Sequence, residues 1–520
     1  MNAKTLIILL ILSVFFGREA PAQKLSVVRL EVPSAMEEET FHLETLDVFG
    51  VLVFYESNEL NSEEQRKWYF ALFNKSIKQQ WLKFVALPDK IEYVESKRSG
   101  NKLHMLFKNI SGARFEKGFY EIVTYDLKAQ NFTNISGFIP MKAEIGGFEI
   151  IGNTACVGLN LKKDETDVLF INLSNGDISP IHIEEGNQNH IENILADKHK
   201  KNFYAVLKTI KDRRYMTDEI IVFSKDGKQV NNLEINNVEN LKLLRSFILV
   251  PDKSKKLSFL GTYDVVTGRN ASLSDLKEGE DAKGAGMFFL QFDETGEQLL
   301  KFYDFLSFEN IYGSVGGREM SYSRNNVSAQ DKPSKKNLSA LFHFYAPQVF
   351  KKDNQYIFSV ELYKPYYRNE TRMEYDYYGR PMPYTYSVFE GYKFYDLIVA
   401  GLSPNGDLIW NNDFQIQDLK TFSLSQNVVV FNDGDYISMA YVNDGKVHSQ
   451  TIEGPIDIGR EESAIETNFS KDRIAGDANN FIRHWYGDYF LIYGYQKLKN
   501  RTLEDKSTRT VFYANKVAYK

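Results

Sequence analysis

The residues best suited to chemistry lie in one segment, Lys364–Lys393, where tyrosines alternate with charged side chains. The candidate binding residues in it are Tyr366, Tyr367, Arg372, Tyr375, Tyr377, Tyr378, Arg380, Tyr384 and Tyr386. Tyrosine offers a rigid apolar ring and a hydroxyl, which suits the recognition of proteins or sugars. Because disordered linkers are poor in aromatic residues, we expect the segment to be ordered. It predicts a binding surface; the alternatives are a cap of tyrosines packed on one another and, less favoured, an active site.

Motifs for catalysis or metal binding are absent from the sequence. It has no zinc-protease helix motif, no Gly-x-Ser-x-Gly elbow and no phosphate-binding loop with its lysine. His182, His190 and His199 are expected on an outer strand, near a link between sheets and at a turn on the opposite face, so we predict no metal site and no cofactor. A pair of carboxylates contributed by distant segments stays possible, and the sequence does not single one out.

A recurring hairpin indicates the elements that carry this segment. Tyr69–Trp81 and Ile398–Trp410 align without a gap, tryptophan on tryptophan, and Ile220–Asn231 and Phe288–Leu300 fit the same register. Each copy starts with an apolar strand and then turns, at a glycine in three of them, as tight hairpins require. Ile77 stands at the glycine position of the first copy, so we expect that turn to differ.

The spacing of these hairpins predicts a β-propeller. Looser copies occur at Tyr120–Phe132, Val168–Ile178 and Tyr436–Val447. The first four copies along the chain recur every ~45–50 residues, the period of a four-stranded blade, and two further strands fit before each hairpin. Asn480–Tyr486, Tyr489–Tyr495 and Arg509–Ala518 make only three strands, which Lys24–Val32 would complete. We predict an all-β fold: a single propeller of about eight four-stranded blades, with seven as the alternative, closed by pairing the N- and C-terminal strands.

One hairpin also carries a resemblance. Asp396–Trp410, with an apolar strand, then Ser-Pro-Asn-Gly, then Asp-Leu-Ile-Trp, resembles the repeat of bacterial secreted β-propeller repeat proteins. Tyr69–Trp81 is similar to a more diverged copy of it. The resemblance implies a fold and export and no particular chemistry.

Long insertions are expected on one face of the propeller. Val265–Gly284, Ser307–Ser339 and Lys364–Lys393 fall, respectively, between second and third strands, between consecutive blades, and again between second and third strands. These connections all open on the same face, over two adjacent blades. A short helical stretch, Asn61–Lys67, is predicted there as well, with Asn61 or Ser62 as its cap.

The N-terminus reads as a cleaved secretory signal, residues 1–22, leaving residues 23–520 as one propeller domain. Leu6–Phe16 is apolar and is followed by Ala20-Pro21-Ala22. No stretch reaches the ~20 apolar residues of a membrane-spanning helix. The only cysteine, Cys156, lies far from the signal, so we expect a buried thiol, no lipid anchor and no intramolecular disulfide. A formal net charge of −6 argues against nucleic-acid binding.

These features predict a soluble, exported protein of the periplasm or the extracellular space. We expect a non-catalytic propeller that binds a protein or glycan partner through its insertion-rich face. The alternatives are a glycan-processing hydrolase or lyase at the mouth of the channel, and a structural subunit of an envelope complex. The sequence does not decide whether the protein is an enzyme, although it favours a non-catalytic protein.

Overall fold

A computed structural model describes residues 28–34, 40–110, 117–183, 188–211, 215–237, 242–251, 255–265, 283–305, 308, 342–375, 377–503 and 508–518. Over these ranges the chain is built of strands, with two short 3-10 turns, η1 (Asp47–Phe49) and η2 (Lys162–Asp164), and no α-helix. No helix in the described part is long and apolar enough to cross a membrane. The prediction of an all-β fold is therefore confirmed.

The strands form eight antiparallel sheets, each built from consecutive strands except the last. The first two sheets are β2 (His42–Thr45), β3 (Val51–Leu60), β4 (Arg66–Phe73), β5 (Gln79–Leu87) and β6 (Ile91–Ser99), β7 (Lys102–Asn109), β8 (Gly118–Asp126), β9 (Asn131–Ile139). The next two are β10 (Glu144–Ile151), β11 (Thr154–Asn160), β12 (Thr166–Asn172), β13 (Ile178–His182) and β14 (Gln188–Asp197), β15 (Asn202–Lys211), β16 (Tyr215–Ser224), β17 (Gln229–Ile235).

The second half of the chain continues the pattern. The fifth sheet is β18 (Lys242–Leu249), β19 (Leu257–Val265), β20 (Lys283–Phe292) and β21 (Gln298–Asp304). The sixth is β22 (His343–Lys352), β23 (Gln355–Tyr375), β24 (Pro381–Leu402) and β25 (Leu408–Gln415), with the short β26 (Lys420–Thr421) beside β24. The last two are β27 (Val429–Asp433), β28 (Tyr436–Asn443), β29 (Lys446–Glu453), β30 (Ile456–Ala464) and β31 (Arg473–Tyr486), β32 (Tyr489–Lys499), β33 (Thr508–Ala518), β1 (Val28–Pro33).

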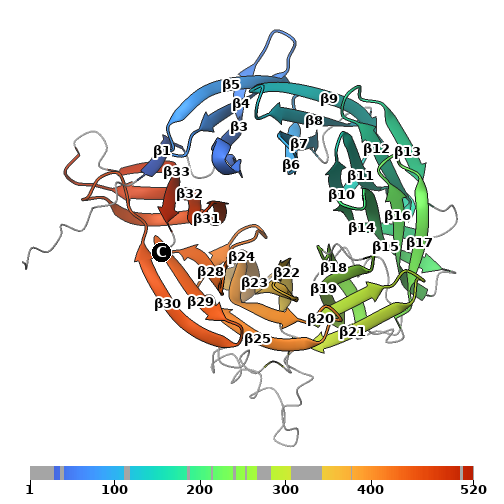
Figure 1. Ribbon diagram of the computed structural model, residues 1–520. Coiled ribbons are helices and arrows are strands. Elements are labelled where there is room, and N and C mark those ends of the chain that lie inside the picture. The colour runs from blue at the N-terminus through green and yellow to red at the C-terminus, as the bar shows by residue number, and fades with distance from the viewer. Residues whose placement is uncertain are drawn as a thin grey trace, which may run out of the picture.

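The sheets follow one another around a common centre, which is the arrangement of a β-propeller (Figure 1). In each, the first strand lies towards the centre and the last towards the rim. Apolar clusters fill the space between neighbouring sheets, as where Phe54 of β3 packs with Phe107 and Tyr125 of the next sheet. A matching cluster joins the last sheet to the first through Trp485, whose Nε1 also donates to the Gly50 carbonyl at 3.0 Å. Cys156 is buried in such a cluster, as predicted.

The repeated hairpin turns are more alike than the sequence indicates. Gly227, Gly296 and Gly406 have φ values of 78°, 85° and 79°, as the glycine rule predicts. Ile77 takes the same left-handed conformation at φ 52°, and its N–H donates to the Asn74 carbonyl just as Gly406 donates to Ser403. The prediction of a different turn is therefore wrong. Ile77 is buried against the last sheet, and this burial offsets the backbone strain of a β-branched residue there.

The predicted helix at Asn61–Lys67 is also wrong. The chain makes a tight turn after β3, and strand β4 already begins at Arg66. The Asn61 Oδ1 accepts hydrogen bonds from the backbone N–H groups of Glu63 and Gln65, both at 2.9 Å. Asparagine makes the same hydrogen bonds from backbone N–H groups to its side chain in a turn as at the start of a helix. The sequence analysis therefore identified the residue that makes these bonds but predicted the wrong kind of element.

The N-terminal strand completes the last sheet at its outer edge. β1 pairs antiparallel with β33, from Val28 opposite Lys516 to Pro33 opposite Val511. This confirms the predicted pairing of the two ends, while residues 24–27 of the predicted strand lie outside the described residues. Val28, Leu30 and Val32 pack towards the first sheet, whereas the alternate residues of β1 point the other way.

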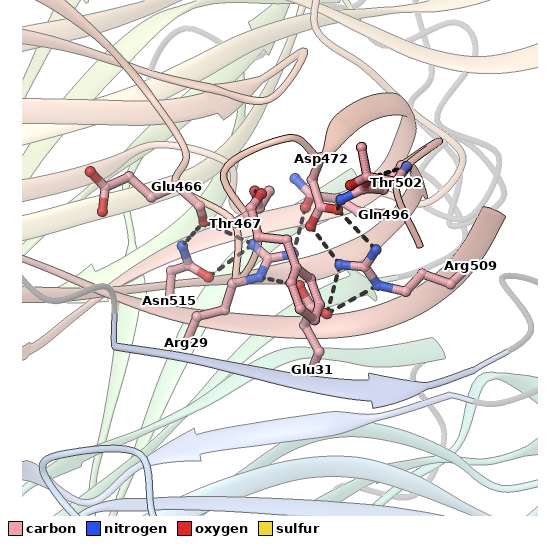
Figure 2. A network of polar contacts seen from close by, with 11 residues as sticks. Arg29, Glu31, Glu466, Thr467, Asp472, Gln496, Thr502, Arg509 and Asn515 are labelled. Carbon is pink, nitrogen blue, oxygen red and sulfur yellow. Dashed lines mark hydrogen bonds and ion pairs between the residues drawn. The ribbon is translucent and has the colours of Figure 1, made fainter. Parts of the chain in front are cut away.

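Those alternate residues, Arg29 and Glu31, enter a polar network that we call the seam (Figure 2). The Arg29 guanidinium donates to Glu31 at 2.8 Å, Gln496 at 2.8 Å and Asn515 at 3.0 Å. Glu31 also accepts from Arg509, which binds Asp472 through two further hydrogen bonds of 3.0 and 2.5 Å. The seam therefore ties β1 to three segments from the other end of the chain.

Candidate functional site: the β23–β24 ribbon

Strands β23 and β24 run far beyond the rest of their sheet. β22 pairs with β23 only from Gln355 to Tyr363, and β25 pairs with β24 only from Asp396 to Leu402. Beyond these limits β23 and β24 continue to pair with each other out to Tyr375 opposite Pro381. We call this two-stranded extension, residues 364–393, the ribbon. It coincides with the predicted insertion, which is ordered as expected but is a hairpin of the two strands.

The register divides the ribbon into two faces, because opposite residues of an antiparallel pair share a face and successive residues alternate. The charged face carries Arg368, Glu370, Arg372 and Glu374 from β23 opposite Val388, Tyr386, Tyr384 and Met382 from β24. The uncharged face carries Tyr367, Asn369, Thr371, Met373 and Tyr375 opposite Phe389, Ser387, Thr385, Pro383 and Pro381.

Polar and ring contacts organise the charged face. Arg368 lies 2.6 Å from Glu370 and 2.7 Å from Glu390. The Tyr386 hydroxyl donates to Glu370 at 2.8 Å, and this bond raises the pKa of Tyr386 above its ordinary value. The guanidinium of Arg372 lies 5.3 Å from the centre of the Tyr386 ring, within cation–π range. Charges and tyrosines therefore form one continuous strip.

The uncharged face is held by weaker cross-strand pairs. Tyr367 and Phe389 pack edge to face, with ring centroids 5.6 Å apart. Thr371 and Thr385 share a hydroxyl hydrogen bond of 3.0 Å, and the Ser387 hydroxyl donates to Asn369 at 2.8 Å. Such pairs fix the register of the ribbon without burying it.

The structure distributes the candidate binding residues over the whole ribbon. The charged face has Arg372, Tyr384 and Tyr386, the uncharged face has Tyr367 and Tyr375, the turn has Tyr377, Tyr378 and Arg380, and Tyr366 lies at the base under Lys420. They are thus on one element but not in one patch. Glu370 and Glu374, which the sequence analysis left out of the site, belong to the charged face. The alternation of charge along Arg368–Glu374 was the signal that could have found them.

Exposure distinguishes the ribbon from a cap of packed tyrosines. Tyr375 is 72% exposed, Tyr377 96% and Tyr384 56%, although these residues lie on different sides. Both faces of the ribbon therefore meet solvent over most of its length. This favours the binding-surface prediction over the packed cap.

Buried charges elsewhere in the propeller have a different role. The Lys208 side chain is fully buried, is bonded to Asp218, and donates to the Leu244 carbonyl of the next sheet at 2.5 Å. Glu192 accepts from the Ser246 N–H of that sheet at 2.8 Å. Burial raises the pKa of Asp218, and the Lys208 charge opposes that effect. These groups link neighbouring sheets through hydrogen bonds to the backbone of the next sheet.

A cavity of about 490 Å³ lies between the last two sheets and is lined in part by Ser438, Glu461 and Phe490. None of its lining residues belongs to the ribbon.

His182, His190 and His199 lie on β13, on β14 and in the turn after β14, as expected. Within the described ranges, no three His, Cys, Asp or Glu side chains are grouped to hold a metal ion.

Comparison with known proteins gives similarity of structure alone. Neither a protein-family profile nor a characterised protein sequence matches the chain. A prolyl endopeptidase is 9% identical with a TM-score of 0.37, over 90% of this chain and 54% of its own, so the chain spans about half of that enzyme. The propeller domain of the Trilobed protease from Pyrococcus furiosus is 12% identical with a TM-score of 0.31, over 73% and 98% of the two chains. The periplasmic gluconolactonase of Pseudomonas aeruginosa is 8% identical with a TM-score of 0.32, over 80% and 100%. At these values the similarity assigns neither a family nor an activity.

Proposed function

We propose that this chain is an exported, non-catalytic β-propeller that binds a protein partner through the ribbon. The observation that carries the proposal is a two-stranded ribbon with exposed aromatic side chains on both faces and charged side chains on one of them. An isolated two-stranded hairpin is marginally stable in water, and one that displays large aromatic side chains gains stability when a partner covers them. A protein partner is favoured over a glycan because the ribbon offers strand edges as well as rings.

The propeller serves as a rigid base for the ribbon. We propose that the eight sheets are the eight blades of one closed ring, formed by residues 23–520. Two observations support closure: the apolar cluster between the last sheet and the first, and the pairing of β1 with β33. In a closed ring every sheet packs against two neighbours, so the sheet that carries the ribbon is a fixed base for it.

Export rests on the signal read in residues 1–22, which lie outside the described residues together with most of the other two insertions, 265–284 and 307–339. N-terminal sequencing of protein purified from its native host tests cleavage. A mature chain that starts at Gln23 is the expected result. Retention of Met1 in the folded protein would contradict export through a cleaved signal.

Site-specific photo-crosslinking tests the binding role of the ribbon. A benzophenone amino acid replaces Tyr375 in one variant and Phe138 of the rim strand β9 in a control, because the two side chains are 72% and 71% exposed. We expect protein adducts after illumination of intact cells at Tyr375, at least ~5-fold more than at Phe138. Equal yields at the two positions would contradict the proposal. Adducts that contain only carbohydrate would point to a glycan ligand and would reject the protein partner.

A further inference from the structure

One long edge of the ribbon has no neighbouring strand among the described residues. β24 covers one side of β23 as far as Tyr375, whereas β22 covers the other side only as far as Tyr363. Backbone N–H and C=O groups along residues 366–375 therefore face away from any strand that the structure describes. Such an edge can accept an additional strand.

Proline distinguishes the two edges of the ribbon. Pro381 and Pro383 lie on β24, and proline has no N–H group to donate to an added strand. Residues 366–375 of β23 contain no proline. The edge of β23 is therefore the one that can form an unbroken ladder with a partner.

The charge pattern of this edge is complementary to itself. Along the charged face of β23, Arg368, Glu370, Arg372 and Glu374 alternate in sign. Two copies of the strand placed antiparallel about a two-fold axis at Thr371 bring Arg368 opposite Glu374 of the second copy. The same axis brings Glu370 opposite Arg372 of the second copy. Every charge then faces its opposite, which stabilises a strand pair.

The pattern also selects the register. A shift by two residues in either direction would place Arg372 opposite Arg372, or Glu370 opposite Glu370, and like charges directly opposite destabilise a pair. In the favoured register the uncharged face brings Tyr367 opposite Tyr375 of the second copy at both ends. Aromatic pairs at the ends of the ladder add apolar contact to the charge pairs.

We propose that two copies of this chain associate edge to edge through residues 367–375 of β23, forming one four-stranded sheet across both molecules. The inference rests on the proposed function of the ribbon and identifies its partner as a second copy. The geometry of a C2 dimer, with the same patch on both copies, follows from the axis at Thr371.

Existing ion pairs do not prevent this exchange of partners. Arg368 and Glu370 pair with each other within one copy, but their side chains are 58% and 39% exposed. Exposed pairs contribute only about 0–1 kcal/mol, so giving one up costs little. Because a single pair of edge strands is a small interface, we expect a dissociation constant on the order of 10 µM that rises with salt.

Charge-reversed variants in analytical ultracentrifugation test the inference. The acidic-edge variant carries Arg368→Glu and Arg372→Glu, and the basic-edge variant carries Glu370→Arg and Glu374→Arg. We expect the unmodified protein to dimerise, each variant alone to associate at least ~10-fold more weakly, and an equimolar mixture to form heterodimers. Heterodimers would also show that both variants are folded. A control, Lys446→Glu with Glu462→Lys, swaps an exposed pair on β29 and β30 and should leave dimerisation unchanged.

Each other outcome rejects the edge-to-edge dimer. Unmodified protein that stays monomeric at about 200 µM and low salt contradicts it, as does dimerisation that survives both charge reversals. A mixture that fails to associate rejects the proposed charge pairing between the two edges. If the protein is monomeric while Tyr375 still crosslinks to another protein in cells, the proposed function stands and only the identity of the partner is wrong. If neither dimer nor adduct forms, both proposals fall.

Discussion

The seam and the ribbon use the same chemistry in opposite settings. Both place arginine and glutamate on neighbouring positions of antiparallel strands. In the seam, the Arg29 side chain is 0% exposed and that of Glu31 is 11%, whereas Arg368 and Glu370 of the ribbon are 58% and 39% exposed. Arg29 also donates to two side-chain amides, and its guanidinium lies 4.5 Å from the Tyr513 ring.

The difference shows how burial decides what a charged pair does. A buried guanidinium must have its hydrogen bonds satisfied inside the protein, so its partners are fixed and it contributes to one structure. An exposed pair is screened by water and can exchange its partner at small cost. The seam charges therefore hold the strands of the last sheet together, whereas the ribbon charges can change partners.

The largest expected effect comes from removing one seam arginine. Arg29→Ala leaves the buried amides of Gln496 and Asn515 without their donor, so we expect about 3–5 kcal/mol loss in the free energy of unfolding. The matched change in the ribbon, Arg368→Ala, should cost less than about 0.5 kcal/mol. Urea titration followed by tryptophan fluorescence measures both. Similar losses for the two variants would contradict the distinction.

Acid should weaken the seam. Burial works to raise the pKa of Asp472, but hydrogen bonds from Arg509 and Asn500 outweigh it and hold the pKa below its ordinary value of 3.8. The unfolded state then binds the proton more readily, so this stabilisation is present above pH ~4 and is lost as pH falls through the folded pKa. Asp472→Asn should flatten the fall in stability below pH ~4, compared with the unmodified protein.

An opposite pH dependence is expected where the ribbon meets its sheet. Burial raises the pKa of Glu361 from 4.5 to about 7, against hydrogen bonds from the N–H groups of Asn427 and Val428. The folded state binds the proton more readily, so the contribution of Glu361 to stability is fully present below pH 4.5 and is lost as pH rises through about 7. Comparison of Glu361→Gln with the unmodified protein by thermal unfolding should show a smaller decline over this range. Parallel declines would reject this role for Glu361.

The smallest effect concerns a hydroxyl on the charged face. Tyr386→Phe removes the hydrogen bond to Glu370 at the surface of the ribbon, so we expect almost no change in the free energy of unfolding. If the ribbon binds a partner, the same variant should nevertheless reduce photo-crosslinking from Tyr375. A clear loss of stability would mean that the ribbon is part of the folded core.

The sequence predicted those features of the fold that depend on local patterns of residues. Apolar strands, glycine turns and the leftover N-terminal strand led to the sheets and to the pairing of β1 with β33. It failed where tertiary contacts decide: burial against the last sheet lets Ile77 take a glycine conformation, and the turn at Asn61 forms no helix. The seam partners of Arg29 lie hundreds of positions away, so spacing could not reveal them.

The sequence predicted which segment contains the candidate site but not how the side chains of that segment are arranged. Tyrosine content pointed to residues 364–393, but the division into two faces depends on the strand register, which only the structure supplies. The alternating charges of Arg368 to Glu374 were visible in the sequence. Their meaning became clear only once residues 366–375 were placed at the edge of a sheet.

Hydrogen exchange compares the seam and the ribbon in one experiment. In dilute purified protein we predict strong protection of the β1 and β33 amides and fast exchange along residues 367–375 of β23. Raising the protein concentration, or adding the native envelope fraction, should protect residues 367–375 and leave β1 and β33 unchanged. Protection of the ribbon equal to that of the seam in dilute protein would contradict the account, because the ribbon would then be packed without a partner.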